Sequence, residues 1–377
     1  MSANDTSPAW AYLSRVAEVP CAELAELVGR VGPVEAAERV RRGAVAQPLA
    51  RRTEARRDID CAAEDLELLH RRGGRLVTAD DDEWPALAFS AFLGAPVRDK
   101  PEGLAPLALW VIGPLRLDEA SRRSAAIVGT RASTAYGQHV AAELSAGLVE
   151  QEVTVVSGGA YGIDGAAHRA ALAADGTTVA VLAGGVDVLY PAGHSALLHR
   201  VAGSGLLVSE YPPGVRPARY RFLTRNRLVA ALSGATVVVE AGVRSGAAST
   251  AAWARGLGRV VCAVPGPVTS AASTGCHVLL QAGAELVTRA QEVVELIGRP
   301  GEFADERPRP ALALDALSDD ERAVYEALPG RGARTPDEIA VASGLPAAGV
   351  LGPLAMLEIA GLVQQQEGRW RLARDRP

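Results

Sequence analysis

The densest group of residues that could hold a polyanion lies between positions 216 and 227. It contains five arginines and two aromatic residues in twelve positions, without one acidic residue. Guanidinium groups bind phosphates through paired hydrogen bonds, and aromatic rings offer faces on which bases stack. A solvated loop is the plainer interpretation, since nearly every cation of this chain is an arginine and Lys100 is the one lysine. We favour a site for single-stranded nucleic acid, because neutralising a backbone and stacking bases together need this mixture.

Three glycine-containing segments that follow short apolar runs could also approach an anion. They are Gly129-Thr130-Arg131, the stretch from Ser157 to Gly162, and the stretch from Gly184 to Tyr190. Glycine lets a backbone come close to a ligand, and successive N–H groups can form a concave anion nest. Asp164, just after the second segment, is expected to cap the helix that follows, and a role as a catalytic acid is the less favoured alternative.

A parallel sheet is the element expected to bring these segments together. Short apolar runs alternate with helical stretches, which predicts strands at 125–128, 153–156, 177–182, 206–209, 236–239, 260–264 and 285–287. Such alternation is typical of a parallel sheet covered on both faces. We therefore predict an α/β fold with a Rossmann-like doubly wound sheet, whose ligands collect beyond the carboxyl ends of the strands.

Two further domains are predicted on the flanks of this core, which is expected over residues 81–298. Residues 1–80 look helical, like a SAM or helix-hairpin-helix domain, although we favour a tight turn between packed helices for Val31 to Ala37. A linker rich in proline and charge is expected over 299–314. Residues 315–377 predict a winged helix, with helices near 317–328, 335–342 and 346–360 and a hairpin of 363–366 and 370–372. Its third helix contains no Arg, Lys, Asn or Gln, so we do not expect it to read a DNA duplex.

The charge of the chain is unevenly distributed. The formal net charge is −5, yet residues 121–290 carry 14 arginines against 9 acidic residues, a local charge of +5. A basic region inside an acidic chain suits an anionic ligand held at one place. The four cysteines are far apart and predict free thiols in a reducing compartment. The lack of a signal peptide or a membrane-length apolar run favours a cytoplasmic protein without a membrane partner.

Patterns that would indicate catalysis or a cofactor are missing from the sequence. There is no GxGxxG after the first strand and no GxxxxGK[ST] loop, and His168 and His194 have no partners at metal-ligand spacing. We therefore predict no catalytic residue, no metal and no cofactor, which argues against an NAD-type oxidoreductase. The alternative kept open is a nucleotide phosphoribohydrolase of the lysine-decarboxylase-like group, which is similar in fold. That group carries a glutamate in the helix after a late strand, whereas the helix turn expected near Ala247 contains no carboxylate.

Taken in order, these segments resemble the DprA/Smf family. The matching stretches are Ala125 to Arg131, Ser157 to His168, Tyr190-Pro191, Ser209 to Gly214, Arg225-Asn226-Arg227 and Ala263 to Gly266. Each stretch is weak by itself, but the ordered set over residues 121–287 is specific. Three departures are a missing proline in Phe222-Leu223-Thr224, before Arg-Asn-Arg, smaller side chains than usual from Ser245 to Thr250, and His277 where asparagine is usual.

The resemblance implies a protein that binds single-stranded DNA without sequence preference, protects incoming strands during natural transformation and helps to load the RecA recombinase. It also implies a homodimer formed through the Rossmann-like domain. The residues predicted to contact single-stranded DNA are Arg131, Ser157, Gly158, Gly159, Gly162, Tyr190, Arg219, Arg221, Phe222, Arg225, Asn226 and Arg227.

Overall fold

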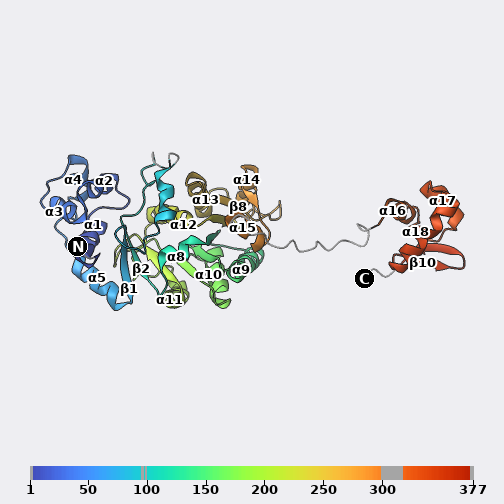
Figure 1. Cartoon of the computed structure of the whole chain (residues 1–377), viewed down its shortest axis with the longest axis horizontal. Helices are drawn as coiled ribbons and strands as arrows, with labels where there is room; N and C mark the ends of the chain where they lie inside the picture. The colour runs from blue at the N-terminus through green and yellow to red at the C-terminus, as the bar shows by residue number, and fades with distance from the viewer. Residues whose placement is uncertain (1–2, 95–96, 98–99, 299–316, 374–377) are drawn as a thin grey trace. The chain divides into compact units, whose positions relative to one another are not determined.

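The computed structural model of the chain describes residues 3–94, 97, 100–298 and 317–373. These residues divide into two compact units, within 1–304 and 305–377 (Figure 1). The predicted linker, 299–314, lies outside the described residues.

A nine-stranded sheet organises the first unit, in the order β1-β2-β6-β5-β4-β3-β7-β8-β9. The seven strands from β6 to β9 in this order pair in parallel, and they match the seven strands predicted from the sequence within a few residues. The strands are β1 (Gly74–Thr78), β2 (Ala108–Ile112), β3 (Ser124–Val128), β4 (Thr154–Ser157), β5 (Thr178–Val181), β6 (Leu206–Ser209), β7 (Ala235–Val238), β8 (Val260–Ala263) and β9 (Glu285–Leu286).

The order of the strands reverses at β3, the first parallel strand along the chain. Its neighbours are β4 on one side and β7 on the other. In doubly wound sheets the loops on the two sides of such a reversal leave in opposite directions and open a crevice. The fold therefore provides a binding crevice at the carboxyl ends of β3 and β7.

Helices cover both faces of this sheet, as the uninterrupted apolar strands require. Ala126 and Val128 of β3 belong to a core shared with α12 and α13, whereas Ala125 and Ile127 pack with α9, α10 and α15. Figure 1 shows α12 and α13 on one side of the strands and α9, α10 and α11 on the other. The helices of the parallel region and its approach are α6 (Ala86–Phe89), α8 (Leu117–Arg122), α9 (Ala135–Glu150), α10 (Ile163–Ala173), α11 (Ser195–Ser204), α12 (Arg219–Ala231), α13 (Gly246–Gly256), α14 (Thr274–Gln281) and α15 (Ala290–Ile297), with short 3₁₀ turns at Ser90–Leu93 and Ala192–His194.

The N-terminal region is helical up to Arg71 and then adds a strand to the sheet. The expectation that residues 1–80 are helical throughout was therefore wrong at its end, where β1 pairs antiparallel with β2 and β2 pairs antiparallel with β6. Gly73 at φ +68° ends the preceding helix, and the run from Leu76 to Thr78 then extends. The helices are α1 (Ala3–Val16), α2 (Ala22–Val31), α3 (Pro33–Arg41), α4 (Gln47–Thr53) and α5 (Ala62–Arg71).

The N-terminal helices share their core with the sheet. Tyr12, Leu24 and Val40 belong to the same apolar cluster as Trp110 of β2 and Leu198 of α11. The turn from Val31 to Ala37 joins two packed helices, with Gly32 at φ +78° and proline at the first position of α3. This is the tight turn that the sequence favoured.

The second unit consists of three helices and a hairpin, as predicted for residues 315–377. Capping boxes begin α16 (Asp319–Glu326) at Ser318 and α17 (Pro336–Ser343) at Thr335, and each satisfies two backbone N–H groups. The remaining elements are α18 (Ala347–Ile359), β10 (Val363–Gln366) and β11 (Arg369–Leu372). Val324, Ile339 and Leu354 are buried in its own apolar core.

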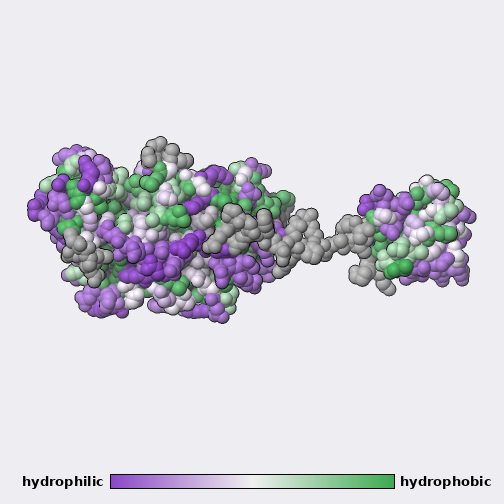
Figure 2. All heavy atoms as spheres, viewed as in Figure 1, coloured by the Kyte–Doolittle hydropathy of each residue, from purple (hydrophilic) through white to green (hydrophobic). Residues whose placement is uncertain are grey.

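Hydrophobic side chains remain at the surface of this second unit, visible as green spheres in Figure 2. Val341 of α17 and Leu351, Met356 and Ile359 of α18 are all more than half exposed. Across the residues that the structure describes, no single helix is long and apolar enough to cross a membrane. Helices Pro336–Ser343 and Ala347–Ile359, which are bent by 103° relative to each other, reach that length and apolarity only as a pair.

The cysteines and His168 have structural roles in the fold. The four cysteines are free thiols in the described part of the chain. His168 of α10 is fully buried, with its Nδ1 2.8 Å from Thr178 Oγ1, and this hydroxyl donates to Val155 O at 2.8 Å. The imidazole is therefore the donor, and burial lowers the pKa of His168 to about 3.

We expect His168 to make the fold sensitive to mild acid. The unfolded chain, with an ordinary histidine pKa of about 6.5, takes up a proton between pH 6.5 and 3 that the folded chain does not bind. Stability is therefore lost as the pH falls below about 6.5, by about 2 kcal/mol at pH 5 for this residue. In urea titrations, the free energy of unfolding should fall between pH 7.5 and pH 5 by about 2 kcal/mol less in His168→Gln than in the wild type. Equal pH dependence of the two proteins would contradict this assignment.

Candidate functional site

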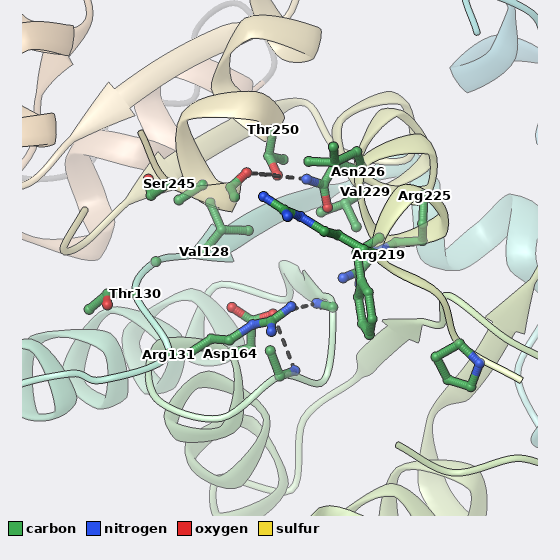
Figure 3. Close-up of a pocket in the computed structure, with 18 of the residues that line it drawn as sticks. Val128, Thr130, Arg131, Asp164, Arg219, Arg225, Asn226, Val229, Ser245 and Thr250 are labelled. Atoms are coloured by element: carbon green, nitrogen blue, oxygen red, sulfur yellow. Dashed lines mark hydrogen bonds between the residues drawn. The ribbon is translucent and has the colours of Figure 1, made fainter. Parts of the chain in front are cut away.

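A pocket of about 740 Å³ lies at the carboxyl edge of the sheet, where the strand order reverses. Its floor is the loop from Val128 to Arg131 after β3, together with Gly158 and Ala160 after β4. Residues of α12 form one wall, and the start of α13 forms another. Figure 3 shows Arg131 and Asp164 on one side of the pocket and Asn226, Ser245 and Thr250 across from them.

The pocket is strongly basic. Four arginines line it, Arg131, Arg219, Arg225 and Arg244, against the single carboxylate of Asp164. Arg131, Arg219 and Arg244 are exposed, and no ion pair to a described acidic residue neutralises them. Unpaired guanidinium groups around a concave surface attract a polyanion and bind it through charge-assisted hydrogen bonds.

Arg225 is the buried member of this set. Its side chain, 5% exposed, donates from Nη1 to Val181 O at 2.5 Å, while its Nε is buried without a partner among the described atoms. Burial lowers the pKa of Arg225 to about 10, so the guanidinium stays charged at neutral pH. The buried charge of Arg225 adds to the positive potential of the pocket.

Asp164 stabilises the glycine-rich loop. Its Oδ2 accepts hydrogen bonds from the backbone N–H groups of Gly158 at 3.1 Å and Ala160 at 3.4 Å. The expectation that Asp164 caps α10 was wrong, because Gly162 occupies the N-cap position. Burial raises the pKa of Asp164, and the nearby charge of Arg225 opposes that effect. The N–H of Gly158, which we had expected to bind a phosphate, thus already donates to Asp164.

An aromatic surface borders the pocket beside Arg131. The rings of Tyr190 and Phe222 lie 5.6 Å apart at 55°, and the Arg131 guanidinium lies 4.9 Å from the centre of the Phe222 ring. Tyr190 is 48% exposed, so one ring is available to a ligand while Phe222 and Arg131 support it. Rings and guanidinium planes in this arrangement accept a flat base.

The start of α13 was not among the predicted contacts. Arg244, Ser245 and Gly246 line the pocket directly after β7. The Ser245 hydroxyl accepts from Ala248 N at 3.2 Å, and Asn226 Nδ2 donates to Gly246 O at 3.2 Å, which fixes the helix terminus. The first N–H groups of a helix carry partial positive charge, so this terminus adds to the basic character of the pocket.

Seven of the predicted contact residues line this pocket. They are Arg131, Gly158, Tyr190, Arg219, Phe222, Arg225 and Asn226.

Three other predicted residues belong to the glycine-rich segment itself and hold its conformation. The buried Ser157 hydroxyl donates to Ile127 O at 2.7 Å, inside the sheet. Gly159 O lies 3.1 Å from His194 Nδ1, and Gly162, at φ +76°, packs so closely that a Cβ would lie 2.2 Å from Thr130 O. Glycine is therefore required at position 162 for both conformation and space.

Arg221 and Arg227 point away from the pocket because the basic segment forms a helix. Arg227 is fully buried, with Nη2 2.8 Å from Glu210 Oε1 and Nε donating to Glu102 O. Arg221 binds both carboxylate oxygens of Glu18, at 2.7 and 2.9 Å. At 100° per residue, a helix presents to one ligand only part of a continuous basic run. These two arginines hold α12 in place, and we do not count them as ligand contacts.

The fold and site define a Rossmann-like protein with a basic pocket at its topological switch point. Residues 75–298 match the model for DNA recombination-mediator protein A, and residues 308–369 match the DprA winged helix domain. The chain belongs to the DprA/Smf family, as its sequence motifs indicated.

Two relatives match this chain over most of their own length. The chain is 71% identical over 371 residues to a putative DNA processing protein DprA of Mycobacterium tuberculosis, which spans 98% of this chain and 95% of that protein. It is 36% identical over 270 residues to Protein Smf of Escherichia coli, covering 70% of this chain and 71% of that protein.

Two solved structures are similar as well. The DNA processing protein A of Streptococcus pneumoniae superposes with a TM-score of 0.63 at 30% identity, covering 81% of this chain and all of that one. The Helicobacter pylori protein gives a TM-score of 0.50 at 27% identity, covering 59% and 94%, and is described as having a unique single-stranded DNA binding mode.

The structural role of Arg227 gives a direct prediction. Removing one partner of a buried ion pair leaves the other charge uncompensated, which typically costs about 3–5 kcal/mol. We expect Arg227→Ala to lower the free energy of unfolding by that amount in urea titrations, whereas Arg219→Ala, at an exposed position of the same helix, should change it by less than about 0.5 kcal/mol. Equal stability of the two variants would contradict the role assigned to Arg227.

Proposed function

We propose that the chain binds single-stranded DNA without sequence preference in the pocket at the reversal of the strand order. The observation that carries this proposal is the convergence of three exposed, unpaired arginines and the Tyr190–Phe222 pair on one concave surface. Phosphates are expected at Arg131, Arg219 and Arg244, beside the buried charge of Arg225. The single-strand binding described for the Helicobacter pylori relative supports the same choice of ligand.

A single strand suits this pocket better than a duplex. The aromatic surface needs a base whose face is free, and in a duplex both faces are covered by neighbouring pairs. Stacking and phosphate contacts do not distinguish one base from another, because every base has a π-face. The site therefore favours binding that is independent of sequence.

The winged helix is expected to contribute little to this binding. The surface of α18 exposes Leu351, Met356 and Ile359, and α18 has no basic or amide side chain with which to contact DNA. Such a surface is better suited to packing or to binding a protein.

Protection of incoming strands during transformation, loading of the RecA recombinase and homodimerisation are the parts of the proposed function that rest on the family resemblance. For the homodimer, the edge strand β9 offers a surface on which Val278 of α14 and Leu286 are each about half exposed.

Binding without catalysis is favoured over the phosphoribohydrolase alternative. That activity needs a free carboxylate in the helix after a late strand, and α13 contains none. The carboxylate that does line the pocket, Asp164, is held by the loop N–H groups and faces Arg225.

Fluorescence anisotropy with an oligothymidylate tests the proposal. Arg131→Ala removes a phosphate contact and the cation beside Phe222, so we expect about a tenfold loss of affinity and a salt dependence shallower by about 0.7 log units per log unit of salt. The matched control is Arg122→Ala, an exposed arginine at the end of α8, next to the amino end of β3. Equal losses in the two variants, or binding of a duplex by the wild type as tight as that of the single strand, would contradict the proposal.

A further inference from the structure

We propose a second nucleotide-binding subsite outside the pocket, formed by Tyr161 in the loop before α10, Arg169 of α10 and Arg200 of α11. It would hold the nucleotides that continue from the pocket, with Tyr161 as a stacking platform and the two arginines as phosphate contacts. This inference rests on the proposed function and specifies the path of the strand beyond the pocket.

Tyr161 has the properties of a preformed stacking platform. Its ring is 45% exposed, yet it is fixed at both ends. The hydroxyl accepts from Gly193 N at 3.2 Å, and the ring packs edge-on against His194, with 4.7 Å between ring centres and 71° between planes. Because the ring is already held in place, a base that stacks on its exposed face gains contact at little cost in side-chain entropy.

The platform adjoins the pocket through two short segments. Gly158 and Ala160, which line the pocket, immediately precede Tyr161 in the same loop. Gly193, which binds the Tyr161 hydroxyl, lies three residues beyond Tyr190, the exposed ring of the pocket. The hydrogen bond between Gly193 and the Tyr161 hydroxyl thus links the Tyr161 ring to the segment that carries Tyr190.

The surface of the two helices behind Tyr161 is basic. Arg169 of α10 and His199 and Arg200 of α11 are exposed, and neither arginine has an ion-pair partner in the part of the chain described. The one acidic residue within these helices is Asp164, which is buried inside the loop. The exposed charges within these two helices are therefore cationic, which suits a phosphate backbone.

Arg169 lies close to the platform. A Cβ built on Gly165 would lie 2.4 Å from His194 Cε1 and 3.2 Å from Arg169 Nη1, so the guanidinium and the imidazole that supports Tyr161 approach the same point. Arg169 is six residues past the start of α10, about 9 Å along the helix axis. The subsite thus extends from the sheet edge over the outer surface.

Oligonucleotide length separates this subsite from the pocket. We would measure the binding of oligothymidylates of about 4 and about 16 nucleotides, which bracket common single-strand site sizes. For the long strand we expect Tyr161→Ala to lose at least about fivefold in affinity, the lower end of one lost stacking contact. Arg169→Ala/Arg200→Ala should make the salt dependence of the long strand shallower by about 1.4 log units, 0.7 for each phosphate contact. Binding of the short strand should stay within about twofold in each variant.

Two controls complete the design. Tyr161→Phe keeps the ring and should bind the long strand as the wild type does, and Arg122→Ala reports the effect of losing any surface cation. If the Tyr161 and double-arginine variants bind the long strand like the wild type while Arg131→Ala weakens both strands, the subsite is refuted and the proposed function stands. If the wild type binds neither strand, or Arg131→Ala has no effect on either, the proposed function fails and the subsite fails with it.

Discussion

The reversal of strand order at β3 is the constraint on which the rest of this site depends. Because β4 and β7 flank β3, the loops after β3 and β7 separate and leave a crevice at the carboxyl edge of the sheet. The chain must also cross from β6 to β7, on the other side of β3, and α12 makes that crossing. The helix thereby brings a basic segment directly over the crevice.

Two kinds of arginine result from this arrangement, and their partners distinguish them. Arg227 and Arg221 bind Glu210 and Glu18 and fix α12 to the sheet and to the N-terminal helices. Arg131, Arg219 and Arg244 lack such partners among the described residues and face the pocket. Asp164 makes a similar contribution at the floor of the pocket, where it accepts a hydrogen bond from Gly158 N beside Arg225. The buried ion pairs and hydrogen bonds thus hold in place a surface whose own charges are left for a ligand.

Much of this fold could be predicted from the sequence, because apolar runs that alternate with helices have few other solutions. The seven parallel strands and the three helices of the winged helix followed from periodicity and capping residues. Strands β1 and β2 did not, since they precede the alternation of strands and helices and pair antiparallel, between residues 30 to 38 positions apart. The pocket was predicted at the correct edge, but not all of its residues. Charge density along residues 216–227 could not show which arginines a helix turns inward, and Arg244 joins the pocket only because β7 lies next to β3.

Hydrogen exchange of backbone amides, measured by mass spectrometry with and without an oligothymidylate, tests the central claim most directly. If the crevice beside β3 is the binding site, peptides that contain residues 129–132, 158–162 and 244–250 should exchange more slowly in the complex, whereas α8 and the winged helix should be unchanged. Protection confined to residues 317–373, or binding that leaves the three pocket segments unaffected, would contradict the account.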